Sequence, residues 1–218
     1  MRGLALSGST GGPPRRILLL GAHCDDIEIG CGGTVLRLVR DYPQAFFHWV
    51  VFSSNATRAA EARTAAAALL GKAAHEIAIK EFRNGYFPYI GAEIKDYFEE
   101  LKRAPAPDLI FTHYRNDLHQ DHRIVSELTW NTFRDHLILE YEIPKYDGDL
   151  GSPSAYIALD TETAARKADV IVESFVSEGD KHWFTRDTFL ALARLRGIEC
   201  AAPGGYAEAF YARKMTIA

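Results

Sequence analysis

The order of apolar and amphipathic segments predicts an α/β fold, with a Rossmann-like, doubly wound and mostly parallel sheet that carries helices on both faces. Short apolar runs, such as residues 16–20 (RILLL) and 108–112 (DLIFT), have the character of strands that are buried on both sides. Segments with helical spacing separate these runs. Strands that alternate with helices in this way form parallel βαβ units.

The individual elements follow from local patterns of residue type. Continuous apolar or alternating runs predict strands, and apolar residues at three- and four-residue spacing predict helices. The alanine-rich segment 56–70 has strong helix propensity, and Gly71 directly after it is a typical C-cap. We expect strands over residues 16–20, 46–52, 75–82, 108–112, 137–143, 155–159 and 209–214, and helices over residues 35–40, 56–70, 91–103, 124–133, 161–172 and 185–196.

Length and composition indicate one soluble domain. Residues 1–14 are rich in Gly, Ser and Pro and are expected to form a flexible tail, and residues 15–218 a single domain. A formal net charge of −4 with scattered Lys and Arg excludes a basic surface for nucleic acid. No apolar run approaches the roughly 20 residues of a membrane helix. Three cysteines without a CxxC pair, Cys24, Cys31 and Cys200, favour a reducing compartment, so we expect a cytoplasmic protein.

Two polar clusters follow two of the predicted strands. Ligands of open parallel sheets bind in the crevice outside the carboxyl ends of the strands, so clusters at these ends can converge even when about ninety residues separate them. The first cluster contains His23, Asp25 and Asp26, and the second contains His113, Asp117, His119, Asp121 and His122.

The residue types of the two clusters indicate a metal site. His23 and Asp26 are three residues apart in a tight loop, so both can face one ion while Asp25 points elsewhere. A His nitrogen and a carboxylate oxygen suit zinc, and either His122 or His119 can supply a third ligand. The fourth position is then left for water, which is typical of catalytic zinc sites. Zinc lowers the pKa of its water towards roughly 7.

The remaining polar residues suit acid–base roles. Asp25 is the candidate general base, because its neighbour Asp26 is committed to the metal. If His122 binds the metal, His119 is free to stabilise an oxyanion or to protonate a leaving amine. Asp121 would then hold the tautomer of His119 and raise its pKa.

Each motif is also compatible with a purely structural role. Asp25 or Asp26 could simply cap the following helix, and an isolated HxxD or HxDH is more often a cap than a metal site. The density of histidines and aspartates after one buried strand favours the metal site, because charged groups at a sheet edge must be paired or coordinated. The glycines of GCGG, which no Lys follows, suggest close backbone packing rather than a phosphate cradle.

At these residues the sequence resembles the LmbE-like (PIG-L) N-acetylglucosaminyl deacetylase family. The segment Ala22-His23-Cys24-Asp25-Asp26-Ile27 stands where the family motif reads A-H-P-D-D-E, and His119-Gln120-Asp121-His122 matches the H-x-D-H motif. The resemblance implies zinc binding by the first histidine, the second aspartate and the last histidine, a base at the first aspartate and an oxyanion-stabilising histidine. The implied residues are His23, Asp26, His122, Asp25 and His119, in that order.

The resemblance also implies a substrate contact by Arg58, which matches the position of a family arginine, and we expect Asp117 to contact the substrate as well. Two positions depart from the family motif. Cys24 replaces the proline, so the loop loses a fixed φ, and Ile27 replaces the glutamate. Neither position is a predicted ligand or base, so these changes suggest a divergent subfamily rather than lost activity.

These observations together predict a zinc-dependent hydrolase that removes the acetyl group from an N-acetylated amino sugar or sugar conjugate. Hydroxide on the metal would attack the amide carbonyl, and acetate and a free amine would leave. The partner is then a small molecule, and the sequence does not determine whether the chain forms a homo-oligomer. The alternatives are another metal hydrolase, such as an amidase or a two-ion phosphoesterase, or a sugar-binding module without activity. The candidate base Asp25 argues against a module that only binds.

Overall fold

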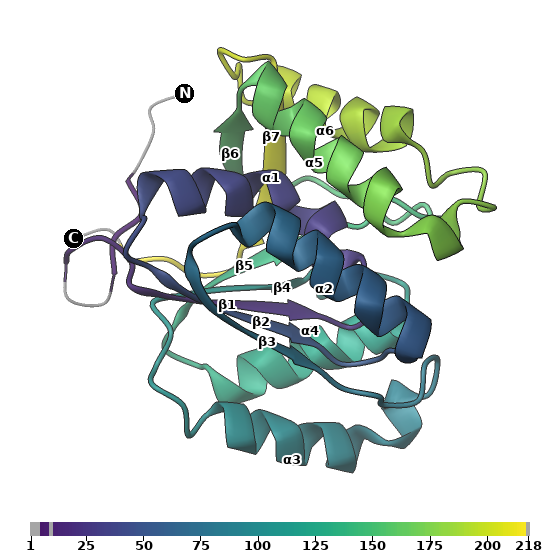
Figure 1. Ribbon diagram of the computed structural model, residues 1–218. Coiled ribbons are helices and arrows are strands. Elements are labelled where there is room, and N and C mark those ends of the chain that lie inside the picture. The colour runs from purple at the N-terminus through teal and green to yellow at the C-terminus, as the bar shows by residue number, and fades with distance from the viewer. Residues whose placement is uncertain (1–4, 9–10, 217–218) are drawn as a thin grey trace.

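A seven-stranded sheet forms the centre of the computed structural model, which describes residues 5–8 and 11–216 (Figure 1). The strand order is β3-β2-β1-β4-β5-β7-β6. Strands β1 to β5 are parallel, whereas β7 pairs antiparallel with both β5 and β6. The strands are β1 (Arg16–Gly21), β2 (Phe46–Val51), β3 (Ala74–Ile79), β4 (Leu109–His113), β5 (Leu137–Tyr141), β6 (Ala155–Leu159) and β7 (Tyr206–Ala212).

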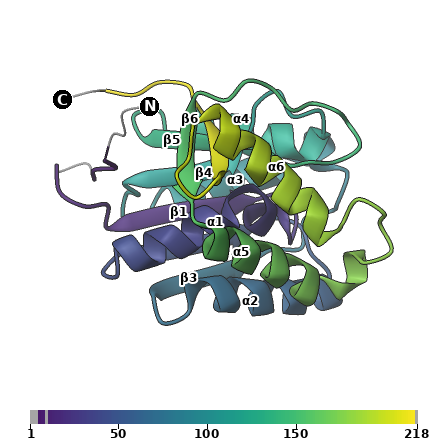
Figure 2. The same ribbon diagram turned by 90° about the horizontal axis from the view of Figure 1, so that it is seen from above.

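Helices cover both faces of this sheet (Figures 1 and 2). One face carries α1 (Asp26–Asp41), α2 (Ala56–Leu70), α5 (Thr161–Ser174) and α6 (Arg186–Glu199). The other carries α3 (Gly91–Leu101) and α4 (Gln120–Thr132). Two short 3-10 helices, η1 (Phe87–Tyr89) and η2 (Val176–Glu178), lie in connecting loops. The predicted α/β class with a doubly wound sheet is confirmed.

Two hydrophobic cores hold these layers together, one on each face of the sheet. Alternate residues of β1 point into opposite cores, because successive side chains of a strand face opposite sides. Leu19 packs with Trp49 and Val35 under α1 and α2, whereas Leu20 packs with Phe98 under α3. None of the described helices is long and apolar enough to cross a membrane.

The predicted N-terminal tail lies partly outside the described residues, because residues 1–4 and 9–10 are not among them. The described part of this segment contacts the domain. Leu6 packs against the larger core, and the hydroxyl of Tyr42 donates a hydrogen bond to the Leu6 carbonyl at 3.4 Å.

Helix α1 differs most from its prediction. It begins at Asp26 rather than near residue 35, and Cys31 interrupts it with non-helical φ and ψ of −146° and 20°. The interruption frees the N–H groups of Gly33 and Thr34, which donate to the two carboxylate oxygens of Glu208 on β7 at 2.9 and 2.6 Å. The buried Lys167 of α5 pairs with Glu208 at 2.5 Å, so a charged pair from the C-terminal part supports the second half of α1.

The glycines of α1 allow this close packing. A Cβ atom at Gly30 would lie 2.2 Å from the ring of Tyr141, and one at Gly33 would lie 2.5 Å from Leu159. The helix therefore approaches β5 and β6 more closely than any residue with a side chain would permit, in agreement with the packing role expected for these glycines.

The topology places the two polar clusters side by side. The chain runs outward from β1 through β2 to β3 on one side, and β4 starts the other side directly next to β1. The carboxyl ends of β1 and β4 therefore flank the point where the strand order reverses, the usual ligand position in such sheets. The first cluster follows β1 and the second follows β4.

Candidate metal centre and active site

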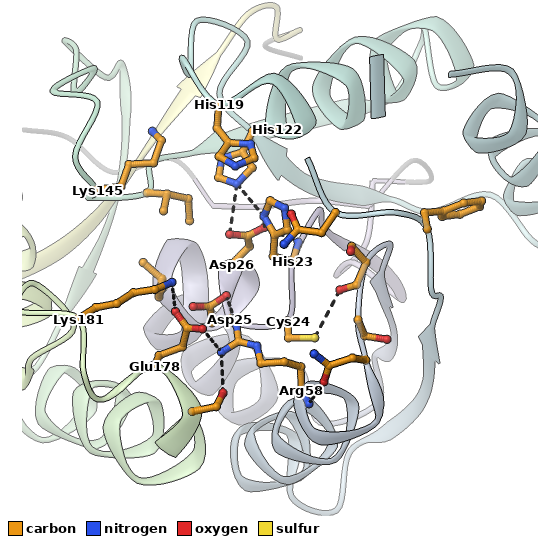
Figure 3. A pocket seen from close by; sticks show the side chains of 18 of the residues that line it. His23, Cys24, Asp25, Asp26, Arg58, His119, His122, Lys145, Glu178 and Lys181 are labelled. Atoms are coloured by element: carbon orange, nitrogen blue, oxygen red, sulfur yellow. Dashed lines mark hydrogen bonds and ion pairs between the residues drawn. The ribbon is translucent and has the colours of Figure 1, made fainter. Parts of the chain in front are cut away.

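The two polar clusters meet at the carboxyl ends of β1 and β4 (Figure 3). The Nδ1 atom of His23 lies 3.1 Å from Nε2 of His122 and 3.3 Å from Oδ2 of Asp26. The same His122 nitrogen lies 3.5 Å from Oδ1 of Asp26. Tetrahedral zinc with bonds of about 2.0–2.1 Å places its ligand atoms about 3.3 Å apart. Each pair among the three predicted ligands thus has the spacing that a zinc ion requires, with the two histidines facing different oxygens of Asp26. Donor atoms of His23, His119 and His122 also lie within 4.8 Å of one another.

Local structure fixes the position of each donor. The backbone N–H of His23 donates to Oδ2 of Asp26 at 2.6 Å, which closes the loop after β1. Asp26 is the first residue of α1, where the helix dipole favours a negative charge. His122 lies in the first turn of α4, which begins at Gln120, four residues earlier than predicted.

A second carboxylate stands behind each histidine. Nδ1 of His122 lies 2.9 Å from Asp117, and Nε2 of His23 lies 3.2 Å from Asp121. Each carboxylate accepts a ring N–H, so the opposite nitrogen of each histidine faces the centre of the site. Carboxylates in this position orient histidine ligands and increase their basicity.

The electrostatics of the site favour a cation. Burial opposes a charge on His23, but the carboxylates of Asp26 and Asp121 outweigh burial and raise the pKa of His23 to about 10. Burial and the neighbouring His113 lower the pKa of His122 to about 3. Without a metal, the two facing nitrogens therefore hold one proton between them, at a place where a divalent ion would satisfy the same carboxylates.

Asp25 lies beside the donor triangle without belonging to it. It occupies the N-cap position of α1, but its side chain makes no capping hydrogen bond and instead accepts one from Arg58 at 2.8 Å. Burial raises the pKa of Asp25 to about 6, although the charge of Arg58 opposes this shift. A carboxylate with a pKa near neutrality suits a general base.

His119 lines the pocket, and its hydrogen bonds and its pKa differ from those that the sequence predicted. Its Nδ1 accepts the backbone N–H of Asp121 at 3.2 Å, so His119 caps α4 and its proton resides on Nε2. Because a metal on Nε2 would require the proton on Nδ1, this cap argues against His119 as a ligand. Burial lowers the pKa of His119, and the charge of His23 lowers it further, so the predicted raised pKa was wrong.

The predicted pairing of His119 with Asp121 was also wrong. The carboxylate of Asp121 accepts the N–H groups of Gly85 at 2.6 Å and Phe87 at 3.2 Å, in addition to its contact with His23. The loop before η1 offers these amides close to the start of α4. They draw the Asp121 side chain away from His119 and towards the first cluster.

Asp117, predicted to contact the substrate, is buried behind the site. It is 3% exposed, and besides His122 it accepts the N–H of His119 at 2.8 Å and pairs with Lys145 at 3.1 Å. Its carboxylate is thus occupied by protein groups. Arg58, the other predicted substrate residue, does line the pocket.

His113 contacts both the loop that carries His23 and the ring of His122. Its Nε2 accepts the N–H of Ala22 at 2.9 Å, and its ring stacks on His122 with centroids 3.9 Å apart. Donor atoms of His113, Asp26 and His122 also lie within 4.8 Å of one another. The Ala22 hydrogen bond occupies the His113 nitrogen that faces Asp26, so we interpret His113 as a support for the His23 loop and not as a ligand.

A pocket of about 830 Å³ opens over these residues. His23, Asp25, Asp26, His119 and His122 form its floor. Segments of the C-terminal part form one wall of the pocket, because the loops after β5 and α5 reach over the same sheet edge. The residues of this wall are Ile143, Lys145, Tyr146, Asp147, Ser177, Glu178, Lys181 and Trp183.

The floor of the pocket lies within the part of the chain that matches a known family. A family model described as GlcNAc-PI de-N-acetylase (PIG-L) matches residues 18–133, more than half of the chain and all of the floor of the pocket. No curated protein matches the sequence at a significant level.

Several solved structures share the fold. N,N'-diacetylchitobiose deacetylase from Pyrococcus horikoshii is 18% identical with a TM-score of 0.67, over 90% of this chain and 83% of that chain. The A40926 pseudoaglycone deacetylase is 19% identical with a TM-score of 0.68, over 90% and 96%. The 4-carboxy-2-hydroxymuconate hydratase from Pseudomonas putida is 14% identical with a TM-score of 0.70, over 94% and 98%. At these identities the likeness establishes a common fold, on which more than one reaction is represented.

Proposed function

The chain belongs to the GlcNAc-PI de-N-acetylase (PIG-L) family, and we propose that it is a metal-dependent N-deacetylase that removes the acetyl group from an N-acetylated amino sugar or sugar conjugate. The observation that carries this proposal is the combination of a donor triangle, formed by His23, Asp26 and His122, with a separate carboxylate, Asp25, on the floor of one pocket. A binding module has no need of that additional carboxylate.

Zinc is the ion that we propose for the donor triangle. Two nitrogens and one carboxylate oxygen suit zinc, and their spacing supports it. Another divalent ion could occupy the same ligands in the cell, where availability helps to decide. The bound ion would polarise the amide carbonyl and acidify a water molecule.

The side chains around this position have complementary tasks. Asp25 accepts a proton from the attacking water, and Arg58 holds its carboxylate in place. His119 presents its Nε2–H to the pocket and donates to the oxyanion that develops on the amide carbonyl. The C–N bond then breaks, and the proton held by Asp25 passes to the leaving nitrogen, which gives acetate and a free amine.

The test is acetate release from a panel of N-acetylated monosaccharides, nucleotide sugars and glycolipids by the zinc-loaded protein. We expect at least one substrate to release acetate and amine in equal amounts, and a chelator to abolish turnover. Metal analysis should give one ion per chain, whereas two ions would favour a phosphoesterase. No acetate from any member of the panel, with a full metal site, would contradict the proposal. Hydration of an unsaturated acid by the same preparation would indicate the reaction named for the hydratase of this fold.

A further inference from the structure

The guanidinium of Arg58 is surrounded by carboxylates from two distant parts of the chain (Figure 3). Its NH2 group donates to Asp25 at 2.8 Å, and its NH1 group lies 2.7 Å from Glu178 of η2 and 3.8 Å from Glu61. The hydroxyl of Ser177, next to Glu178, also accepts from NH1 at 3.3 Å. Arg58 is the arginine that contacts the candidate base, and these groups pair with both of its terminal nitrogens.

The other buried cation of the pocket is neutralised in the same way. Lys145 is only 8% exposed and lies 2.5 Å from Asp149 and 3.1 Å from Asp117. At the rim, Lys181 pairs with the outer oxygen of Glu178. Arg83, on the opposite rim, lies over the ring of Tyr86 and has no carboxylate partner among the described residues. Among the described residues, Arg58, Lys145 and Lys181 of the pocket lining therefore all have carboxylate partners, and the proposed metal ion is the positive charge left beside the reacting amide.

We propose that Glu178 is a specificity-determining residue, which neutralises Arg58 so that the pocket accepts uncharged N-acyl amino sugars and rejects those with an anion close to the reacting amide. This inference rests on the proposed deacetylase function. It assigns a role to a residue of the C-terminal wall, outside the segment that matches the family model.

The charge that a substrate meets in the pocket depends on whether Arg58 is paired. A guanidinium is a strong partner for phosphate and carboxylate, because its N–H groups pair with two oxygens at once. While Glu178 holds NH1, an incoming anion must displace a carboxylate that is 13% exposed and packed against Arg58. The anion would also approach Asp25 and Glu178, two negative charges. A neutral polyhydroxylated ring avoids both penalties.

The variant Glu178→Gln tests this directly, because it keeps the shape of the side chain and removes its charge. Asp147→Asn is the matched control: Asp147 lines the same pocket, so the substitution changes the charge equally, but Asp147 lies next to Lys145 and not next to Arg58. Substrates are neutral N-acetylglucosamine glycosides and three anionic analogues, N-acetylglucosamine 1-phosphate, N-acetylglucosamine 6-phosphate and N-succinylglucosamine. The two phosphates place the anion at C1 or C6 of the ring, and the succinyl group places it on the acyl chain. Release of the free amine, which all these substrates share, measures turnover.

We expect the wild-type protein to prefer the neutral substrate over every anionic analogue by at least about 10-fold in kcat/KM. Glu178→Gln should reduce this preference by about 10-fold for at least one analogue, mainly through KM, while zinc content stays at one ion per chain. Asp147→Asn should leave the preference within about twofold of the wild type. An unchanged preference in folded, zinc-loaded Glu178→Gln would overturn the proposal.

If Glu178→Gln fails to fold, the wild-type protein alone can still overturn the inference. Equal turnover of anionic and neutral substrates would show that the pocket has no charge filter, that is, no preference against anionic substrates. If no substrate releases acetate, the proposed function fails. The charge filter is then measured by calorimetric titration with N-acetylglucosamine and its 6-phosphate. Tighter binding of the phosphate by the wild type would reject the filter, and weaker binding that Glu178→Gln reverses would support it.

Discussion

The segment that matches the family model, residues 18–133, and the rest of the chain differ in what they contribute to the site. The first segment supplies every candidate ligand, base and oxyanion donor, all within a few residues of the ends of β1 and β4. Residues 134–216 add the antiparallel strands, α5, α6 and one wall of the pocket. The proposed chemistry therefore depends on short motifs, whereas the proposed choice of substrate depends on loops that only the folded chain brings together.

The largest effect should come from the donor triangle. His122→Ala removes one of three ligands, so we expect bound zinc to fall from about one ion per chain to almost none. Activity should fall at least about 10⁴-fold, because metal catalysis supplies several kcal/mol. Metal analysis and acetate release check this. His119→Asn is the control, since asparagine can still cap α4, and it should keep its zinc. An empty site in His119→Asn together with a full one in His122→Ala would show that the two histidines are reversed.

Asp25→Asn separates chemistry from metal binding within the first segment. The amide is nearly isosteric but cannot take a proton, so turnover should fall about 10²–10⁴-fold while zinc remains bound. The pKa of about 6 gives the direction of the pH dependence: wild-type activity should rise as pH increases through the titration of Asp25. Near-normal turnover in the zinc-loaded variant would rule out the role of Asp25 as base.

Asp117→Asn tests whether Asp117 orients the ligand His122 or contacts the substrate, as the sequence predicted. If Asp117 orients His122, the variant should bind zinc about 10–100-fold more weakly, with little change in KM once zinc is saturating. A competition titration with a chelator measures the affinity. A higher KM with unchanged zinc affinity would instead restore the predicted substrate contact.

Trp183→Phe tests whether the C-terminal wall of the pocket contributes to substrate binding. Trp183 lines the pocket and packs edge-on against Tyr146 and Phe184. Loss of the larger ring should cost about 0.5–1.5 kcal/mol of binding, which raises KM by about 2–10-fold and leaves kcat and zinc unchanged. If kcat fell as far as in Asp25→Asn, the wall would take part in the chemical step, and the proposed separation of chemistry from substrate binding would be wrong.

Glu28→Gln should have the smallest effect on activity, although Glu28 directly follows the first motif. The Glu28 side chain is fully buried, and neither oxygen has a hydrogen-bond partner among the described residues. Burial raises the pKa of Glu28 well above its usual value. Because the folded state holds this proton and the unfolded state loses it near pH 4.3, the wild type loses stability as pH rises above that value.

The glutamine side chain cannot lose a proton, so Glu28→Gln should escape this loss. Its free energy of unfolding relative to the wild type should increase from pH 4 to pH 7, on the order of 1 kcal/mol per pH unit. Urea unfolding at several pH values measures the difference. A difference that is independent of pH would show that Glu28 is ionised in the folded protein.

Elements with a strong local pattern could be predicted from the sequence almost to the residue. The alanine-rich helix α2 has the bounds that its propensity indicated, and β1 extends one residue beyond the predicted strand. The start of α1 could not be predicted, because three glycines weaken the local helical signal and the carboxylate that supports the helix lies 175 residues away, in Glu208. Local patterns cannot report a partner at that distance.

The candidate site shows the same limit on a smaller scale. That the two clusters would meet followed from their places at strand ends, and their donor atoms do meet. The direction of the Asp121 side chain did not follow, because it depends on the amides of Gly85 and Phe87, in a loop without regular pattern. The salt bridge between Arg58 and Glu178 could not be predicted, because no sequence pattern near either residue indicates that the two lie together in the fold.

We expect the interruption of α1 to influence the order of events during synthesis of the chain. The segment that carries Asp26 leaves the ribosome long before β7, yet the N–H groups of Gly33 and Thr34 find their acceptors only on Glu208 of that last strand. Gly30 likewise packs against the ring of Tyr141, which is synthesised much later. A nascent chain that ends at residue 133 contains all three donor residues but not the support that fixes their geometry. We therefore expect metal loading to follow completion of the chain, as a step of maturation rather than of early folding.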